Sequence, residues 1–462
     1  MDKKPNEQND AQNNHTSEVN ANDLLDELRR KRGKADEGRE PRFLSGRLGT
    51  RFHSQAALLE RIVASFEDEH GIDTPSLNEA ETESQKMKLV RDTAEYVLAV
   101  ESVDLSLEEK AELIRRTYAE LFTYGALDAL LSDETITTIL LEGADKVSVR
   151  RGQGELESLN PIFDDEGHLR RVLRRILKDA GTEINPEQPI IEVGLTAYNR
   201  KIAFNIALPP VTFQINVDVR LHPVVLPTLD DLVEQGIMAR SAAQLLEAIV
   251  RSQHGFIIVG DTESGKTTLM SILAQYVDSG ETRVVSVERA GELVLPANAE
   301  QFVVQWGREN YPQQSFGDQI LSVLKKIPHF LILDEVRADE PHSIQPLLRT
   351  DDSSNVLRQA WVFRGTADSK RLVSALGMVA RRADPENGET AVRKLYEALP
   401  FVITLRRSQE RIQLRGIAEW QFSNNAEYPD YVELMAHGWD GVEFTGKLPS
   451  HSLPLPDDFW KS

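Results

Sequence analysis

The feature that most constrains this chain is a glycine-rich loop within residues 256–270, which read FIIVGDTESGKTTLM. The loop matches the pattern G-x-x-x-x-G-K-S/T and stands between an apolar strand and a helix, the context that this pattern requires. Glycines let backbone N–H groups curl around phosphates, and the helix N-terminus adds its positive dipole end. This context disfavours the alternative of a chance match to a glycine-containing turn. The residues that we expect to bind the nucleotide are Gly260, Asp261, Thr262, Glu263, Ser264, Gly265, Lys266, Thr267 and Thr268.

The catalytic groups of such a site are expected from the loop and from a second strand. Lys266 would reach the β- and γ-phosphates of ATP, and the Thr267 hydroxyl would ligate Mg²⁺. Downstream, residues 329–340 read HFLILDEVRADE, an apolar strand that ends in two carboxylates. We assign Asp334 to the metal, through water, and Glu335 to the attacking water, which it would orient or deprotonate. The alternative for this pair is a solvated acidic turn.

A third strand brings further carboxylates to the same edge of the predicted sheet, where open α/β sheets bind their ligands. Residues 284–293, VVSVERAGEL, place Glu288 and Glu292 there. We expect Glu288 to lie on the metal side and Glu292 to act in catalysis, although a surface helix start with ordinary acids fits the spacing equally well. Arg220 ends a predicted strand just before the nucleotide domain and could lean onto the phosphates. As a bare feature it could also be a surface strand residue.

Composition bounds the class of protein. A hydrophobic content of 40% supports real cores, and no stretch approaches the roughly 18 apolar residues of a membrane-spanning helix. Without cysteine, disulfides and thiolate metal sites are excluded, and the N-terminus lacks the apolar core of a secretory signal. A net charge of −21 opposes binding to a phosphate backbone, so no nucleic-acid partner is expected. We therefore expect a cytoplasmic protein.

The order of patterns along the chain predicts several domains. The chain begins with polar residues, and a region with helical spacing of apolar residues follows. Mixed strands and helices come next, and then a regular alternation of strands and helices. The alternation predicts an α/β domain with a parallel sheet covered on both faces. The expected divisions are 1–41, a disordered tail with a short helix; 42–124, a helical module; 125–225, an α+β domain; 226–423, the nucleotide domain; and 424–462, a C-terminal tail. Aromatic residues of that tail are expected to pack on the nucleotide domain rather than to bind a partner.

Taken in this order, the motifs resemble the type II/type IV secretion-system ATPase family, and most closely its branch of Tad-pilus assembly ATPases. The resemblance runs from about Gly125 to Val402. It is carried by GALDALLSDETITTILLEGADKVSVRRGQGELE, which looks like the opening of the family's N-terminal domain, and by LPTLDDLVEQGIM, which looks like its interdomain segment. VERAGELVLP stands at the family's acidic box, and ILDEVRADE looks like its catalytic-glutamate strand.

The resemblance implies a RecA-like P-loop domain preceded by an α+β domain, assembled into a homo-hexamer. ATP would sit between the two domains of one subunit, and its hydrolysis would move them. That motion would drive pilus assembly or protein secretion through an inner-membrane platform protein, so any membrane contact would be peripheral and made through partners. By position, Lys266 and Thr267 are the P-loop pair, Glu335 is the catalytic glutamate and Arg220 is a phosphate-contacting arginine. Glu288 and Glu292 are members of the acidic box.

The chain departs from the family pattern at several positions. Arg289 stands where the acidic box has an Asp, and Glu263 replaces the interior glycine of the P-loop. The family's histidine box should fall near residues 361–366, which read WVFRGT with Phe363 at the histidine position. The glycine-rich turn before that strand is replaced by TDDSSNV at residues 350–356. These departures put turnover in doubt more than nucleotide binding.

Two arginines could compensate for these departures. Where the family has an arginine before Asn205, this chain has Ala203, and Arg200 is a possible substitute. Arg364 could replace the lost histidine. The first hypothesis is therefore a working secretion or pilus-assembly ATPase. The alternative is a degenerate ATP-binding ring subunit with a structural or regulatory role. A DNA-associated motor is disfavoured by the charge and by the lack of a basic-aromatic patch.

Overall fold

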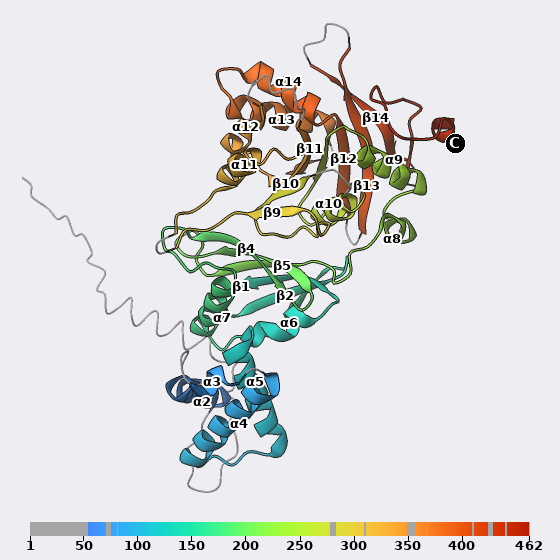
Figure 1. Cartoon of the computed structure of the whole chain (residues 1–462). Coiled ribbons are helices and arrows are strands. Elements are labelled where there is room, and N and C mark those ends of the chain that lie inside the picture. The colour runs from blue at the N-terminus through green and yellow to red at the C-terminus, as the bar shows by residue number, and fades with distance from the viewer. Residues whose placement is uncertain are drawn as a thin grey trace, which may run out of the picture. The chain divides into compact units, whose positions relative to one another are not determined.

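A computed structural model gives the fold of the chain (Figure 1). It describes residues 54–70, 75–80, 82–277, 283–308, 311–348, 357–366, 368–408, 411–423, 428–438 and 441–461. The chain divides into two compact units, Met1–Tyr118 and Ala119–Ser462. The tail and short helix expected within residues 1–41 lie outside the described residues, as does the turn at 350–356.

The described residues of the first unit form helices. Its helices are α2 (Gln55–Glu69), α3 (Pro75–Asn78), α4 (Glu83–Val100) and most of α5 (Leu107–Phe122). A capping box stands at Ser106 before α5, because the Ser106 N–H donates to the Glu109 carboxylate while the Glu109 N–H donates to the Ser106 hydroxyl. Leu58 and Ile62 of α2 pack against Ala94 of α4, and all three side chains are fully buried.

The second unit begins with an α+β domain. After the short η1 (Gly125–Leu127) and α6 (Asp128–Ser132) come β1 (Ile136–Glu142), β2 (Lys146–Arg151), β3 (Leu156–Leu159), α7 (Glu166–Asp179), β4 (Ile190–Ala197), β5 (Arg200–Ala207) and β6 (Asn216–Leu221). The strands pair antiparallel in the order β3-β2-β1-β6-β5-β4. Alternate residues of these strands share one core with the apolar stripe of α7, so the opposite face of the sheet is left for other contacts.

The P-loop domain of the same unit is built on a nine-stranded sheet of order β15-β14-β13-β12-β7-β11-β10-β8-β9. Its strands are β7 (Phe256–Gly260), β8 (Val284–Glu288), β9 (Glu300–Val303), β10 (Phe330–Val336), β11 (Arg358–Arg364), β12 (Phe401–Ser408), β13 (Arg411–Gln421), β14 (Asp430–His437) and β15 (Val442–Phe444). The strands from β12 to β9 run parallel, whereas β13, β14 and β15 continue the sheet antiparallel. The predicted parallel sheet is therefore confirmed in its centre.

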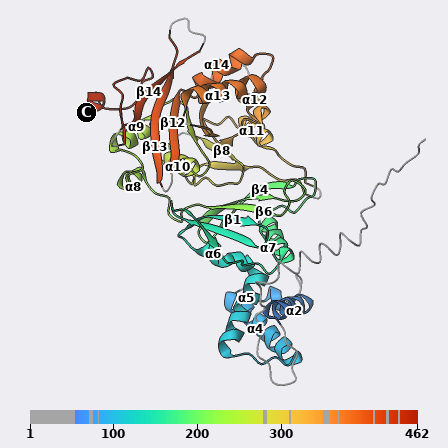
Figure 2. The ribbon, with the colours of Figure 1, turned by 180° about the vertical axis from the view of Figure 1, so that it is seen from behind.

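Helices cover both faces of the large sheet, as Figures 1 and 2 show from opposite sides. One face carries α8 (Leu229–Glu234), α9 (Arg240–Arg251) and α10 (Lys266–Ala274); the other carries α11 (Phe316–Leu324), η2 (Pro341–Ile344), α12 (Gln345–Leu348), α13 (Ser369–Ala383) and α14 (Gly388–Ala398). Neighbouring residues of β7 accordingly enter different cores, with Ile258 on the first face and Ile257 on the second. These layers confirm the α/β fold class, with a RecA-like domain after the α+β domain.

The C-terminal region differs from the expected tail. Residues 430–444 form β14 and β15, which extend the sheet, and only the segment after them lacks strands before the short η3 (Phe459–Lys461). The prolines and exposed polar residues of this region hid its strand pattern. The expectation that its aromatics pack on the P-loop domain is confirmed, because the Tyr431 ring lies 4.9 Å from that of Trp420 and Phe459 joins the core.

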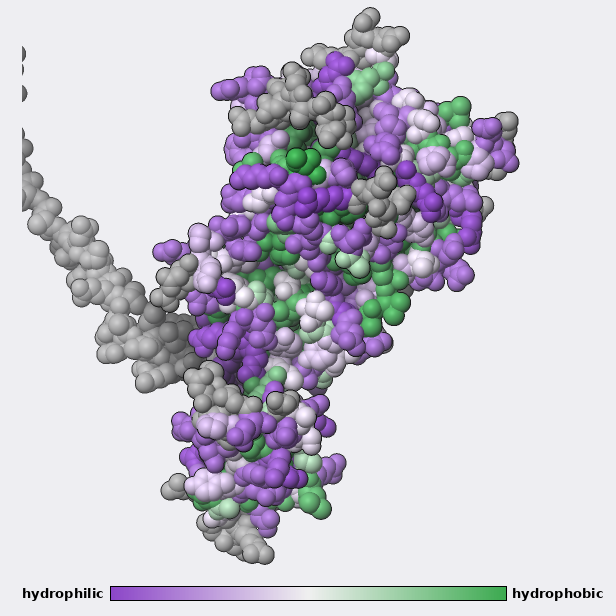
Figure 3. Space-filling view, in the orientation of Figure 1, coloured by the Kyte–Doolittle hydropathy of each residue, from purple (hydrophilic) through white to green (hydrophobic). Residues whose placement is uncertain are grey.

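Hydrophilic side chains dominate the face of the molecule in Figure 3, and its apolar areas are small and separated. Among the described residues, none of the helices combines the length and the apolar character needed to cross a membrane.

Candidate functional site

The P-loop joins the end of β7 to the start of α10, as the sequence predicted. Glycine is required at both of its ends. A Cβ at Gly260 would lie 2.4 Å from the Ser264 Oγ and 2.6 Å from the Leu405 carbonyl, and Gly265 has a φ of +84°. The loop and the first turn of α10, including Lys266, therefore line one cavity of about 340 Å³.

Lys266 is held in the floor of this cavity. Its side chain donates a hydrogen bond of 2.6 Å to the Asp261 carbonyl and is largely buried. Burial is the main cause that lowers the pKa of Lys266 to about 8, and the positive charges of Arg220 and Arg364 lower it further, whereas Glu335 and Asp334 oppose them. An ammonium group that lacks water in this way is stabilised by an anionic ligand.

The carboxylates expected from β10 lie beside the loop. Asp334 is buried, and its Oδ1 lies 3.4 Å from the Thr267 hydroxyl. Burial raises the pKa of Asp334 well above its ordinary value, and the negative charges of neighbouring glutamates raise it further. The next residue, Glu335, has a φ of +56°, and its carboxylate lies 3.5 Å from the Arg337 guanidinium. The positive φ turns the Glu335 side chain out of the strand pattern, toward the edge of the sheet.

The residues around Asp334 fit a divalent cation. The hydroxyl of Thr267 at the start of α10 and the carboxylate of Asp334 on β10 are the kinds of protein donors that Mg²⁺ uses together with water and phosphate oxygens. Among the described residues there is no group of three or more His, Asp or Glu side chains that could hold a metal by themselves.

Glu292 and Arg220 face each other across the two domains. The Glu292 carboxylate lies 2.7 Å from the His222 Nε2, and both residues line the cavity with Arg220 and Lys266. Burial raises the pKa of Glu292, but the hydrogen bond and charge of His222, together with the two cations, outweigh it and lower the pKa. Arg220 itself pairs with Asp218 at 3.5 Å. The structure places both Glu292 and Arg220 on the lining of the cavity.

Glu288 takes another position. It is fully buried, and its carboxylate accepts hydrogen bonds from the Leu293 N–H and the Gln301 amide, both at 2.9 Å, and from Ser286. These bonds fix the turn after β8, and Glu288 does not line the cavity. The metal contact expected of Glu288 stays a prediction, and in this structure its carboxylate is hydrogen-bonded within the turn after β8.

The family departures have defined surroundings. Arg289 donates to the Glu335 carbonyl at 3.0 Å and pairs with Glu340, so it supports the backbone of β10. Phe363 is buried in the sheet core and offers no polar group, whereas the next residue, Arg364, lines a small cavity of about 60 Å³ with Glu335. That position agrees with the compensating role considered for Arg364.

The terminal nitrogens of Arg200 form hydrogen bonds within the α+β domain. Its guanidinium donates to the carbonyls of Leu131, Asp133 and Ile136 inside the α+β domain. These bonds stabilise the segment before β1, while Arg200 also lines the cavity and its buried Nε has no hydrogen-bond partner among the described residues. Its substitution for the arginine missing at Ala203 stays a prediction.

One part of the cavity is apolar and suits a base. It is lined from the α8–α10 layer by Leu232, Ile237, Met238, Leu269 and Ile272, whereas polar residues such as Gln235 and Arg407 line other parts. A nucleotide with its phosphates on the loop would place its ring against this surface.

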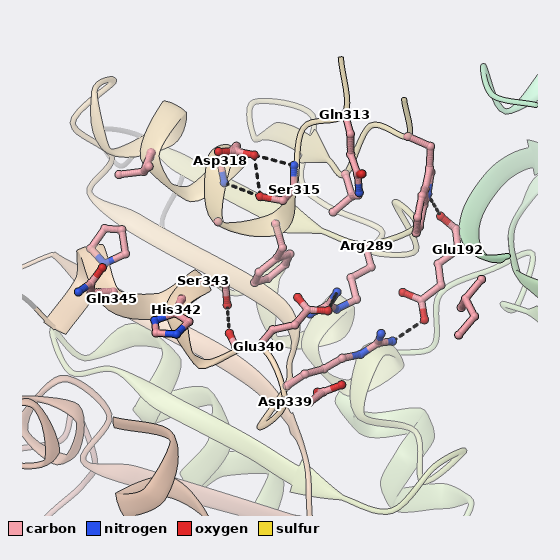
Figure 4. Close-up of a pocket in the computed structure, with 18 residues that line it drawn as sticks. Glu192, Arg289, Gln313, Ser315, Asp318, Asp339, Glu340, His342, Ser343 and Gln345 are labelled. Atoms are coloured by element: carbon pink, nitrogen blue, oxygen red, sulfur yellow. Dashed lines mark hydrogen bonds and ion pairs between the residues drawn. The ribbon is translucent and has the colours of Figure 1, made fainter. Parts of the chain in front are cut away.

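A larger cavity of about 800 Å³ lies on the other side of Arg289 and Arg337 (Figure 4). Arg337 pairs there with Glu192 of β4 at 2.6 Å, and the Trp306 indole donates to the Glu192 carbonyl. Because both arginines also line the small cavity beside Glu335, this region is connected to the candidate catalytic glutamate.

Sequence reasoning missed three residues of the α+β domain. His222 follows Arg220 by two positions, and this spacing on one strand face is a signal that could have identified it. Thr138 and Arg150 contact Glu263 of the P-loop, and no sequence pattern indicates that contact.

The family model described as type II/IV secretion system protein matches residues 123–347, which include β1 to β10 and the P-loop. A putative conjugal transfer protein of Mycobacterium tuberculosis strain H37Rv is 28% identical over 243 residues, covering 51% of this chain and 68% of that protein. The probable conjugal transfer protein TrbB of Sinorhizobium fredii is 25% identical over 304 residues, covering 64% of this chain and 87% of that protein.

Among solved structures, the VirB11 ATPase of the Brucella suis type IV secretion system, in complex with sulphate, is 19% identical with a TM-score of 0.32. The likeness covers 64% of this chain and 96% of that one. The Legionella pneumophila ATPase DotB is 14% identical with a TM-score of 0.44, covering 67% and 82% of the two chains.

Proposed function

We propose, from the premise that this chain belongs to the type II/IV secretion system protein family, that it is a Mg²⁺-dependent ATPase that powers pilus assembly or protein secretion. The observation that carries the proposal is that Lys266 and Thr267 line one cavity that also has an apolar face for a base, while Asp334 lies 3.4 Å from the Thr267 hydroxyl. A P-loop, a hydroxyl and a strand-end acid in this arrangement hold the phosphates and cation of a nucleoside triphosphate.

The roles that we assign follow from these positions. Lys266 would bind the phosphates, and Thr267 and Asp334 would hold Mg²⁺, the latter through water; the cation would supply positive charge to the phosphates. Glu335 orients the attacking water and accepts its proton. Arg220 supplies positive charge from the α+β domain, while Glu292 polarises groups near the γ-phosphate. His222 keeps the Glu292 carboxylate in place.

We infer the cellular setting from the family. The chain would act as a homo-hexamer in the cytoplasm and reach the inner membrane only through a platform protein of the export machinery. The relatives named for conjugal transfer are compatible with an export role. We retain the Tad-pilus branch as the finer proposal, on the motifs that resemble it.

The test is ATP hydrolysis by the purified full-length protein beside Lys266→Ala and Glu335→Gln. Lys325→Ala and Glu386→Gln, at exposed positions outside the cavity, are matched controls. We expect phosphate release in the wild type and controls, and a loss of about 100-fold or more in both site variants. Absence of ATP binding by the wild type would overturn the proposal.

A second candidate function is an ATP-binding ring subunit with weak or no hydrolysis. It is favoured by Phe363, which is buried where the family has a histidine, and by the carboxylate of Glu263 in the P-loop. Tight ATP binding that Lys266→Ala abolishes, with no phosphate release in single-turnover experiments, would favour this candidate over the motor.

A further inference from the structure

The P-loop carries a carboxylate at its sharpest bend. Glu263 has a φ of +58°, a conformation that glycine adopts readily and that strains a residue with a side chain. A negative group in a loop whose N–H groups are directed at phosphates also repels the ligand. Both features are unfavourable for a nucleotide site, so the surroundings of Glu263 must compensate for them.

Those surroundings belong to the α+β domain. The Glu263 Oε1 accepts a hydrogen bond of 2.8 Å from the Thr138 hydroxyl, and its Oε2 lies 3.3 Å from an Nη of Arg150. Thr138 and Arg150 are directly opposite each other on β1 and β2, and Arg220 is opposite Thr138 on β6. One row of the small sheet thus presents a guanidinium, a hydroxyl and a second guanidinium to the P-loop.

Arg150 is built into this joint rather than lying on the surface. Its side chain is only 11% exposed, it also donates to the Gly154 carbonyl, and its Nε is buried without a partner. The following turn is fastened to the P-loop domain as well, because Arg407 donates to the Gln153 carbonyl and the Ile412 N–H donates to the Gln153 side chain. The guanidinium therefore stays opposite Glu263.

We propose that Arg150 is a positioning residue of the nucleotide site, which neutralises Glu263 and fixes the P-loop against the α+β domain so that phosphates can bind. This inference rests on the proposed function, since it requires ATP at the P-loop. Without Arg150, its guanidinium no longer compensates the negative charge of the Glu263 carboxylate, which then repels the phosphates. Without the charge of Glu263, Arg150 has nothing to neutralise and its removal has little effect.

The experiment is a double-mutant cycle on the full chain with substitutions that remove charge but keep size. ATP affinity is measured by calorimetry for the wild type, Arg150→Gln, Glu263→Gln and the double variant. We expect Arg150→Gln to raise the Kd for ATP on the order of tenfold, as contacting residues do when coupled. Glu263→Gln should bind ATP at least as tightly as the wild type, and the double variant should stay within about twofold of Glu263→Gln.

Two further measurements separate this role from a purely structural one. The loss in Arg150→Gln should be larger for ATP than for ADP and absent for adenosine, whereas general damage to the fold would weaken all three. Arg151→Gln is the matched control, because that arginine is 42% exposed and pairs with Asp133. Arg150→Ala with Glu263→Gly repeats the cycle if either glutamine variant fails to fold.

The possible failures are distinguishable. If the wild type binds ATP and Arg150→Gln weakens ATP affinity by the same factor with Glu263 present as with Glu263→Gln, the charge-neutralising role is overturned. The proposed function then still stands. If the wild type binds no nucleotide, the proposed function fails and this inference fails with it.

Discussion

A buried histidine in the α+β domain leads to a quantitative prediction on stability. His168, in the first turn of α7, is almost fully buried, and its Nε2 lies 2.7 Å from the Glu120 carboxylate. Its Nδ1 lies 3.4 Å from the carboxylate of Asp164. Burial alone lowers the pKa of His168, but the hydrogen bonds and charges of these two acids outweigh it and raise the pKa to about 9. We therefore predict that His168 is charged in the folded protein at neutral pH.

The sign of the effect follows from this raised pKa. The ordinary pKa of histidine is 6.5, so the folded state binds the proton more tightly than the unfolded state does. The resulting stabilisation is fully present below about pH 6.5 and is lost as the pH rises through about 9. The difference between the two pKa values corresponds to about 3 kcal/mol, and about 2 kcal/mol remains when water screens the half-exposed Asp164.

The perturbation is His168→Gln, compared with the wild type from pH 6 to pH 10 by urea unfolding and pulse proteolysis. Mass spectrometry of the fragments identifies the α+β domain. The wild type should be more stable than His168→Gln by about 2 kcal/mol at pH 6, and the difference should vanish near pH 10. His342→Gln, at an exposed position of the P-loop domain, should leave the pH dependence unchanged. Parallel stability curves for the wild type and His168→Gln, or a difference that grows with pH, would refute this reasoning.

Two further predictions concern contacts between the domains. Arg337 lies 2.6 Å from Glu192 and 3.5 Å from Glu335. Arg337→Ala should therefore free the candidate catalytic glutamate and raise the rate of single-turnover hydrolysis several-fold. Glu192→Gln should leave Glu335 as the remaining carboxylate partner of Arg337 and lower that rate. Changes in the same direction would contradict this competition. A Cβ at Gly194 would lie 1.6 Å from the Ala290 carbonyl, so Gly194→Ala should force β4 away from the P-loop domain and weaken ATP binding by about tenfold or more, measured by calorimetry. An unchanged affinity would mean that the contact between these strands has no role in nucleotide binding.

The sequence was sufficient for the centre of the P-loop domain because local chemistry determines it. The strand before Gly260 is apolar at every position, the glycines allow the turn, and the helix that starts at Lys266 follows without a break. The same holds for the acids that end β10, since their placement requires only a buried strand and its end. Such features depend on neighbouring residues in the chain.

The parts that could not be predicted depend on residues far apart in the chain. Glu288 and Glu292 are four residues apart, yet the first accepts bonds from its own turn and the second meets His222 of another domain. From the sequence, Glu263 is an unfavourable replacement of a P-loop glycine, and only the structure shows Arg150 at 3.3 Å from its carboxylate. Spacing along the chain carries no information about such partners, because they are set by how two sheets face each other.

These contacts between the domains have a thermodynamic consequence. Residues of the α+β domain meet the P-loop at Glu263, the acidic segment at Glu292, and the end of β10 through Arg337. Each of the three lies beside a part of the site to which we assign the phosphates, the polarising carboxylate or the catalytic glutamate. A ligand that changes the charge at these points must therefore change the strength of domain docking, and docking must change ligand affinity by the same factor. If substitutions at the three contacts altered ATP affinity but left the docking of the two domains unchanged by hydrogen exchange, nucleotide binding and domain position would be independent in this protein.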